Sequence, residues 1–195
     1  MALCRRLSFA LSCALELALL AVGVGLGWLV GTPVFGNVCP GFDSTLVGVV
    51  CVIPLLGMGW WYFKSELSWV VANRGEFERV ALPLFRGWST VQFAIISALA
   101  GVCEEAFFRG AIQGMINGMF GAGPAIILAS IAFGLAHYLN WSYAVLTSLV
   151  GFYLGLLFSW SGNLWIPMLV HGLYDFIALT LFVGRSAEAS AVDDS

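Results

Sequence analysis

Charged residues are scarce in this chain, and their scarcity excludes most soluble folds. Of its 195 residues, only 10% are Asp, Glu, Lys or Arg, whereas 61% are hydrophobic. A soluble domain carries about 25% charged residues. The composition therefore predicts an integral membrane protein with one domain. The formal net charge of −3 provides no basic surplus, so we do not expect nucleic acid as a partner.

Several patterns that would indicate a particular chemistry are absent. The five cysteines include no CxxC pair, so they predict neither a disulfide framework nor a zinc site. We expect most of them to be small apolar core residues. HExxH, GxSxG and GxGD are missing as well. The first apolar run is longer than the roughly 7–15 residues of a signal peptide, so it predicts a membrane helix.

Long apolar segments are abundant. A spanning helix needs about 20 apolar residues, and on that criterion we expect an all-α, polytopic membrane helix bundle of about six transmembrane helices. The segments are Leu7–Val30, Thr45–Phe63, Ser89–Gly118, Pro124–Tyr138, Ser142–Trp160 and Leu164–Val183. Residues 1–184 would form one membrane-embedded domain, and 185–195 a polar, disordered tail. Pro54 predicts a kink in the second segment.

Residues 64–87 hold four of the eight basic residues, interspersed with apolar ones. This mixture predicts an amphipathic segment lying on the membrane surface. With six spans, this segment, Arg5, Arg6 and Arg185 share one side, which the positive-inside rule makes cytoplasmic together with both termini. Gly110, Gly114 and Gly118 recur every four residues and predict a ridge for the close approach of another helix.

Ionisable residues inside the membrane are functional-site candidates by default. Between residues 87 and 184 the only charged residues are Glu104, Glu105, Arg109 and Asp175, and the only two histidines of the chain, His137 and His171, lie in the same interval. Polar groups in lipid need partners. We therefore expect these six side chains to converge in the interior of the bundle.

Spacing predicts how they pair. Glu105 and Arg109 are four residues apart, as are His171 and Asp175, so each pair can share a helix face. Phe133 can likewise pack over His137. Glu104 points about 100° away from Glu105, which leaves it the less compensated carboxylate and suits it to a general base. A Glu base with histidine donors could hydrolyse an amide without metal. Glu104, His137 and His171 could also bind a metal, and the residues alone do not separate these readings.

Three motifs resemble a known family. Glu104-Glu105-x-x-x-Arg109, Phe133-x-x-x-His137 and His171-x-x-x-Asp175 follow one another on successive helices, and Trp165-Ile166-Pro167 precedes the last motif. Together they resemble the CPBP family, the CAAX-protease and bacteriocin-processing (Abi) intramembrane glutamate endopeptidases, over about residues 88–180.

The resemblance implies roles for these residues. Glu104 would activate water, His137 would help hold that water, and His171 would lie at the oxyanion. Glu105 and Arg109 would support the pocket. Prenyl-protein endopeptidases of this family end the last motif in Asn, whereas this chain has Asp175. An ionised carboxylate only accepts hydrogen bonds, so orienting His171 is the role expected for Asp175.

The expected function is therefore intramembrane peptide-bond hydrolysis without metal or other cofactor. The expected partners are the lipid bilayer and a peptide or protein substrate, including lipid-modified or membrane-bound ones. The expected location is a bacterial plasma membrane. Three alternatives stay open: a Glu/His metalloprotease, a non-catalytic immunity or partner-binding protein on the same scaffold, and a proton-coupled transporter.

Overall fold

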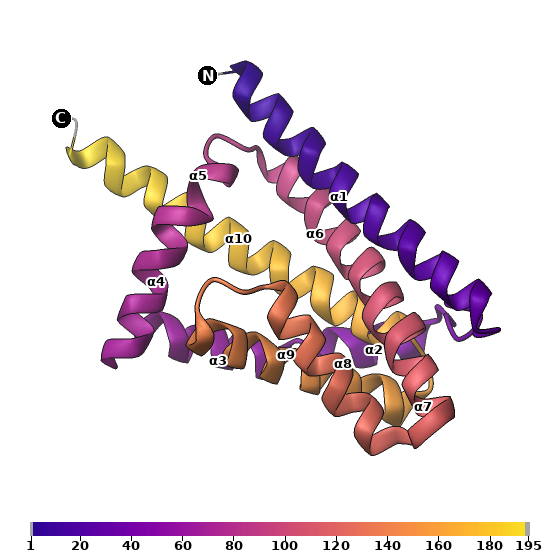
Figure 1. Cartoon of the computed structure of the whole chain (residues 1–195). Coiled ribbons are helices and arrows are strands. Elements are labelled where there is room, and N and C mark those ends of the chain that lie inside the picture. Colours follow the sequence, from indigo (N-terminus) through magenta and orange to yellow (C-terminus); the bar gives the residue numbers. More distant parts are fainter. Residues whose placement is uncertain (1, 194–195) are drawn as a thin grey trace.

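The computed structural model describes the backbone of residues 2–193 and the side chains of residues 5–181, and within that part of the chain it contains helices and no strands (Figure 1). The elements are α1 (Ala2–Leu29), α2 (Phe42–Cys51), α3 (Ile53–Lys64), α4 (Ser68–Val80), α5 (Leu82–Phe85), α6 (Thr90–Glu105), the π-helix η1 (Ala106–Gln113), α7 (Gly114–Phe120), α8 (Ala122–Ala136), α9 (Trp141–Ser161) and α10 (Trp165–Asp193). The predicted all-α class is confirmed.

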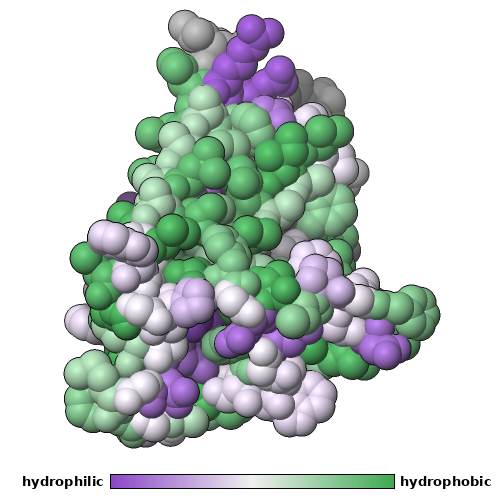
Figure 2. Space-filling view, turned by 90° about the vertical axis from the view of Figure 1, so that its right-hand side faces the viewer, coloured by the Kyte–Doolittle hydropathy of each residue, from purple (hydrophilic) through white to green (hydrophobic). Residues whose placement is uncertain are grey.

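The six predicted apolar segments are all helical. Four stretches are long and apolar enough to cross a membrane: Arg5–Leu29, Phe42–Lys64, Thr90–Phe120 and Trp141–Ser161. The other two, Ala122–Ala136 and Trp165–Leu181, are apolar but shorter. Figure 2 shows a broad hydrophobic surface with hydrophilic patches above and below it. These features define an integral, polytopic membrane protein.

The centre of the bundle is the crossing of α6 and α10, which lie side by side (Figure 1). α1 covers the outer side of α6 and η1, while α8 and α9 pack as a hairpin against η1. The crossing is close because Gly101 meets Gly172: a Cβ on Gly101 would lie 2.6 Å from Met168 O and 2.8 Å from Gly172 N. Larger side chains at these positions would hold the two helices apart.

The sequence predicted a single α-helix over the long third segment, but the structure interrupts that helix. Its middle, Ala106–Gln113, is a π-helix, and six of its eight residues are buried. π-Helical turns are rare and frequently occur at functional sites. Here the irregular turn directly follows the two adjacent glutamates, Glu104 and Glu105, and it carries Arg109.

The predicted glycine ridge has a different neighbour from the one expected. Gly110 packs against Val34 and Gly114 against Thr32, both in the connection after α1, while nothing lies within 4 Å of a Cβ placed on Gly118. The first two glycines therefore accommodate a loop. A ridge of small residues matches loops and helices equally well, because it specifies only close approach.

The remaining expectations concern the chain between and beyond the long helices. Residues 64–87 form two short helices, α4 and α5. The kink predicted near Pro54 appears as a break at Val52 between α2 and α3. α10 continues to Asp193, so the backbone of most of the expected disordered tail is helical. Figure 1 places both chain ends on the same side as α4 and α5.

Candidate active site

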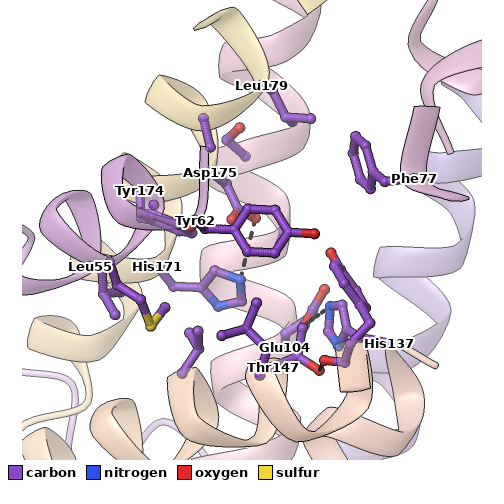
Figure 3. A pocket seen from close by; sticks show the side chains of 18 of the residues that line it. Leu55, Tyr62, Phe77, Glu104, His137, Thr147, His171, Tyr174, Asp175 and Leu179 are labelled. Carbon is purple, nitrogen blue, oxygen red and sulfur yellow. Dashed lines mark hydrogen bonds and ion pairs between the residues drawn. The ribbon is translucent and has the colours of Figure 1, made fainter. Parts of the chain in front are cut away.

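A cavity of about 330 Å³ lies beneath α4 and α5 and is walled mainly by α3, α6, α9 and α10 (Figure 3). Most of its lining is apolar, with Leu55, Met58, Phe77, Val150 and Leu179 among the wall residues. The carboxylates and histidines among the lining residues are Glu16, Glu78, Glu104, His137, His171 and Asp175, and Arg74 lines the cavity as well.

Glu104 projects into this cavity from the last turn of α6. Its Oε2 lies 3.5 Å from His137 Nε2, and this oxygen has no hydrogen-bond partner within the described part of the chain. The residue is only 9% exposed. A buried carboxylate oxygen without a partner is costly, so it marks a place where a water molecule or a substrate group is expected.

His137 is the C-cap residue of α8, where the helix ends and the ring can turn toward the cavity. Its Nδ1 is 2.9 Å from Phe133 O. Because a carbonyl only accepts, Nδ1 carries the proton in this contact. Nε2 is therefore the atom presented to Glu104. The Phe133 ring packs over the imidazole at 4.5 Å, as the spacing of the two residues predicted.

His171 is held at both ring nitrogens. Nδ1 lies 2.9 Å from Glu105 Oε1, and Nε2 lies 3.3 Å from Asp175 Oδ2. The residue is 4% exposed, and its ring packs against that of Phe133 in a T-shaped arrangement with 5.7 Å between the ring centroids. The predicted contact with Asp175 is present. The contact with Glu105, which fixes the other side of the ring, was not predicted.

Glu105 and Arg109 lie behind the cavity wall and are fully buried. Arg109 Nη1 donates to Glu105 Oε1 at 2.7 Å, which is the pair that the spacing predicted, and Arg109 Nη2 donates to Gly151 O at 2.8 Å. The guanidinium also lies 4.7 Å from the centre of the Phe133 ring. Glu105 Oε1 thus joins Arg109 to His171, and through His171 to Asp175.

The structure therefore brings all seven predicted residues together from four elements, α6, η1, α8 and α10. It adds two that the sequence did not single out. Glu16 of α1 lines the same cavity, and its Oε2 is buried without a partner; the signal was its position as the one charge inside the first apolar run. Tyr62 of α3 also lines the cavity, and no motif marked it.

No group of three or more His, Cys, Asp or Glu side chains is arranged to hold a metal ion within the residues that the structure describes. The contacts instead form two units. One is Glu104 with His137, which faces the cavity, and the other is the chain from Arg109 through Glu105 and His171 to Asp175.

The fold and this site define a polytopic membrane protein with an enclosed cluster of carboxylates and histidines. Residues 86–177 match the family described as type II CAAX prenyl endopeptidase, Rce1-like. The uncharacterized protein YpbD of Bacillus subtilis (strain 168) is 32% identical over 116 residues, which cover 58% of this chain and 57% of YpbD. The chain thus matches little more than half of that relative's length. No solved structure is significantly similar to it.

Residues 86–177, with their three motifs in order, match the CAAX-protease (CPBP) family. The matched segment begins just before α6 and ends within α10, so it contains every one of the seven predicted site residues. The match supports a membrane endopeptidase as the class of function.

Proposed function

We propose that this protein is an intramembrane endopeptidase in which Glu104 activates the attacking water. One observation carries the proposal: of two adjacent buried glutamates, Glu105 is paired with Arg109, whereas Glu104 faces the cavity with Oε2 unpaired and 3.5 Å from His137 Nε2. A water molecule that contacts both groups would be held where a carboxylate can take its proton.

The proposed reaction begins when Glu104 accepts a proton from this water and the water oxygen attacks the carbonyl carbon of the scissile peptide bond. The carbonyl π electrons move to oxygen and form a tetrahedral oxyanion. His171, held at both ring nitrogens by Glu105 and Asp175, lines the same cavity. As an imidazolium it would stabilise that charge electrostatically, without a free N–H. The C–N bond then breaks, and Glu104 returns its proton to the leaving amine.

Asp175 has a positioning role in this scheme. Its carboxylate lies 3.3 Å from His171 Nε2 and, when ionised, it can accept hydrogen bonds but not donate one. It therefore orients the imidazole, as carboxylates do in other histidine-containing sites.

The substrate would be a peptide segment of a membrane-bound protein, including lipid-modified ones. The cavity supports this class because it is mostly apolar yet also lined by carboxylates and histidines. The membrane would be a bacterial plasma membrane. Arg5, Arg6 and the basic residues of 64–86 support an orientation with both termini in the cytoplasm.

The test is Glu104→Gln in protein reconstituted into liposomes, assayed with an internally quenched CAAX-type peptide in prenylated and unprenylated form. Loss of the general base is expected to lower kcat by about 10²–10⁴-fold. Glu66→Gln is the matched control, because Glu66 is exposed outside the cavity. Full cleavage by the Glu104→Gln protein would disprove the proposal.

Metal dependence is tested in the same assay. The proposal expects the activity to survive 1,10-phenanthroline and EDTA, with no stoichiometric metal in the purified protein. Loss of activity on chelation, with recovery on adding Zn²⁺, would favour the metalloprotease alternative, in which Glu104, His137 and His171 are ligands.

A further inference from the structure

Tyr62 presents an unpaired hydrogen-bond donor to the cavity from the wall opposite α6. The residue is 9% exposed, and its hydroxyl is buried without a partner within the described residues. Figure 3 shows its ring beside the contact of His171 with Asp175, with the hydroxyl pointing into the cavity. Tyr62 lies in α3, outside the segment that matches the family.

Hydrogen bonds from Arg74 fix the backbone at Tyr62. Arg74 of α4 donates from Nη1 to the carbonyl oxygens of Tyr62 and Phe63, at 2.7 and 2.6 Å. These bonds satisfy carbonyls in the last turn of α3, where the helix has no further residues to donate to them. The backbone that carries the ring is therefore fixed, while the phenol oxygen is left without a bond.

The two histidines themselves offer no free N–H group among the contacts of the described residues. Both nitrogens of His171 face carboxylates, and Nδ1 of His137 is bonded to Phe133 O. Ser97 also has a buried hydroxyl without a partner, but it lies seven residues before Glu104, roughly 10 Å along α6. Tyr62 lines the same cavity as Glu104 and His137, and a phenol remains protonated and able to donate at neutral pH.

We propose that Tyr62 Oη donates a hydrogen bond to the carbonyl oxygen of the scissile bond and stabilises the oxyanion that forms there. This inference rests on the proposed hydrolysis. The attack places negative charge on that oxygen, and a preorganised donor aimed at it stabilises the transition state more than the ground state. The hydroxyl has no partner in the free protein because its partner is the substrate.

The test compares two Tyr→Phe variants with opposite expected effects. Tyr62→Phe removes a hydroxyl with no protein partner, so Tm in detergent should not fall, while kcat should fall about 10²–10³-fold with little change in KM. Tyr153→Phe removes a hydroxyl that donates to Cys51 O at 2.8 Å, outside the cavity. It should lower Tm and leave kcat unchanged.

A second readout does not depend on turnover. A phosphonate analogue of the CAAX-type peptide carries an anionic, tetrahedral group in place of the scissile bond. Its affinity, measured with the reconstituted protein, should fall by about 10²-fold in Tyr62→Phe, matching the loss of transition-state stabilisation. Unchanged affinity for the phosphonate would overturn the proposal.

The kinetic outcomes are equally decisive. Unchanged kcat in Tyr62→Phe, or a rise in KM alone, would overturn the oxyanion role, the latter by showing uniform substrate binding. If Glu104→Gln is inactive in the same assay while Tyr62→Phe is fully active, only this inference fails. If Glu104→Gln is active, the proposed hydrolytic mechanism itself fails.

Discussion

Glu104 and Glu105 are neighbours of identical chemistry in different surroundings. Glu105 is fully buried, and its Oε1 contacts both Arg109 and His171. Glu104 faces the cavity, and its Oε2 lies 3.5 Å from His137 Nε2 without a hydrogen bond among the described residues. Because adjacent helical residues point about 100° apart, a pair of acids can supply one structural group and one group available for reaction.

The buried partner of Glu105 gives a prediction about stability. Arg109→Ala removes the charge that balances Glu105 and also the donor to Gly151 O. Removing one member of a buried ion pair costs about 3–5 kcal/mol, so we expect a large loss of stability together with a loss of activity. Thermal unfolding of the variant in detergent measures it.

Arg79→Ala is the control for this change. Arg79 pairs with Glu76 at 3.0 Å on the exposed side of α4, and exposed pairs contribute at most about 1 kcal/mol. Its Tm should stay close to that of the wild type. An Arg109→Ala protein that unfolds at the same temperature as Arg79→Ala would contradict the structural role of the buried pair.

Residue spacing predicted the local contacts of the site but not the long-range ones. The pairs Glu105–Arg109, Phe133–His137 and His171–Asp175 are each four residues apart and each is present. The contact of Glu105 with His171 joins residues 66 positions apart. Such a contact depends on how α6 and α10 cross, which no local pattern specifies. Tyr62 was not predicted as a site residue for the same reason, because its place in the cavity also depends on how the helices pack.

At the level of elements, the crossing of α6 and α10 sets the distance between Glu105 and His171. Gly101 lies one turn before Glu105, and Gly172 directly follows His171. A methyl group on Gly101 would press on the backbone of α10. The geometry of the site therefore depends on two glycines that take no part in the proposed reaction.

Gly101→Ala should separate these helices. We expect a loss of about 1–3 kcal/mol from overpacking and a fall in kcat, because the 2.9 Å contact of Glu105 with His171 would lengthen. Thermal unfolding and the peptide assay, run on one preparation, measure both effects.

Gly118→Ala is the matched control on α7. Nothing lies within 4 Å of the added Cβ, and alanine favours a helix by up to about 1 kcal/mol over glycine. This variant should be as stable as the wild type or more so. Equal behaviour of the two variants would show that the close crossing does not matter.

The sequence predicted the elements better than their irregularities. Apolar length alone placed all six apolar helical segments, because lipid demands long runs of apolar helix, and four of them are long enough to cross a membrane. The π-helix at Ala106–Gln113 was missed. No local pattern in these eight residues distinguishes a π-helix from an α-helix, so the sequence alone does not reveal the irregular turn.

At the scale of the whole molecule, the two ends of the bundle differ. Arg5 Nη1 donates to Gly87 O, which ties the start of α1 to the connection after α5. At the other end, Cys39 and Asn163 exchange two hydrogen bonds, at 3.0 and 2.8 Å, and join the connection after α1 to the turn between α9 and α10.

The proposed orientation of the two ends predicts a pattern of cysteine labelling. In a variant whose other four cysteines are replaced by Ala, the exposed Cys39 should react with a membrane-impermeant maleimide added to intact spheroplasts. A cysteine-free variant with Glu66→Cys should react only after permeabilisation, because positive residues favour the cytoplasmic side. The reverse pattern would invert the proposed orientation.

The walls of the cavity come from two parts of the chain. Glu104, His137, His171 and Asp175 belong to the segment shared with the family, whereas α3, α4 and α5 supply much of the apolar wall and lie outside it. Substitutions in those three helices can change the shape of the cavity while the contacts among the carboxylates and histidines stay intact. The cleavage reaction and the choice of substrate can therefore change at different rates during evolution. Relatives that share residues 86–177 are expected to catalyse the same reaction more often than they cleave the same substrates.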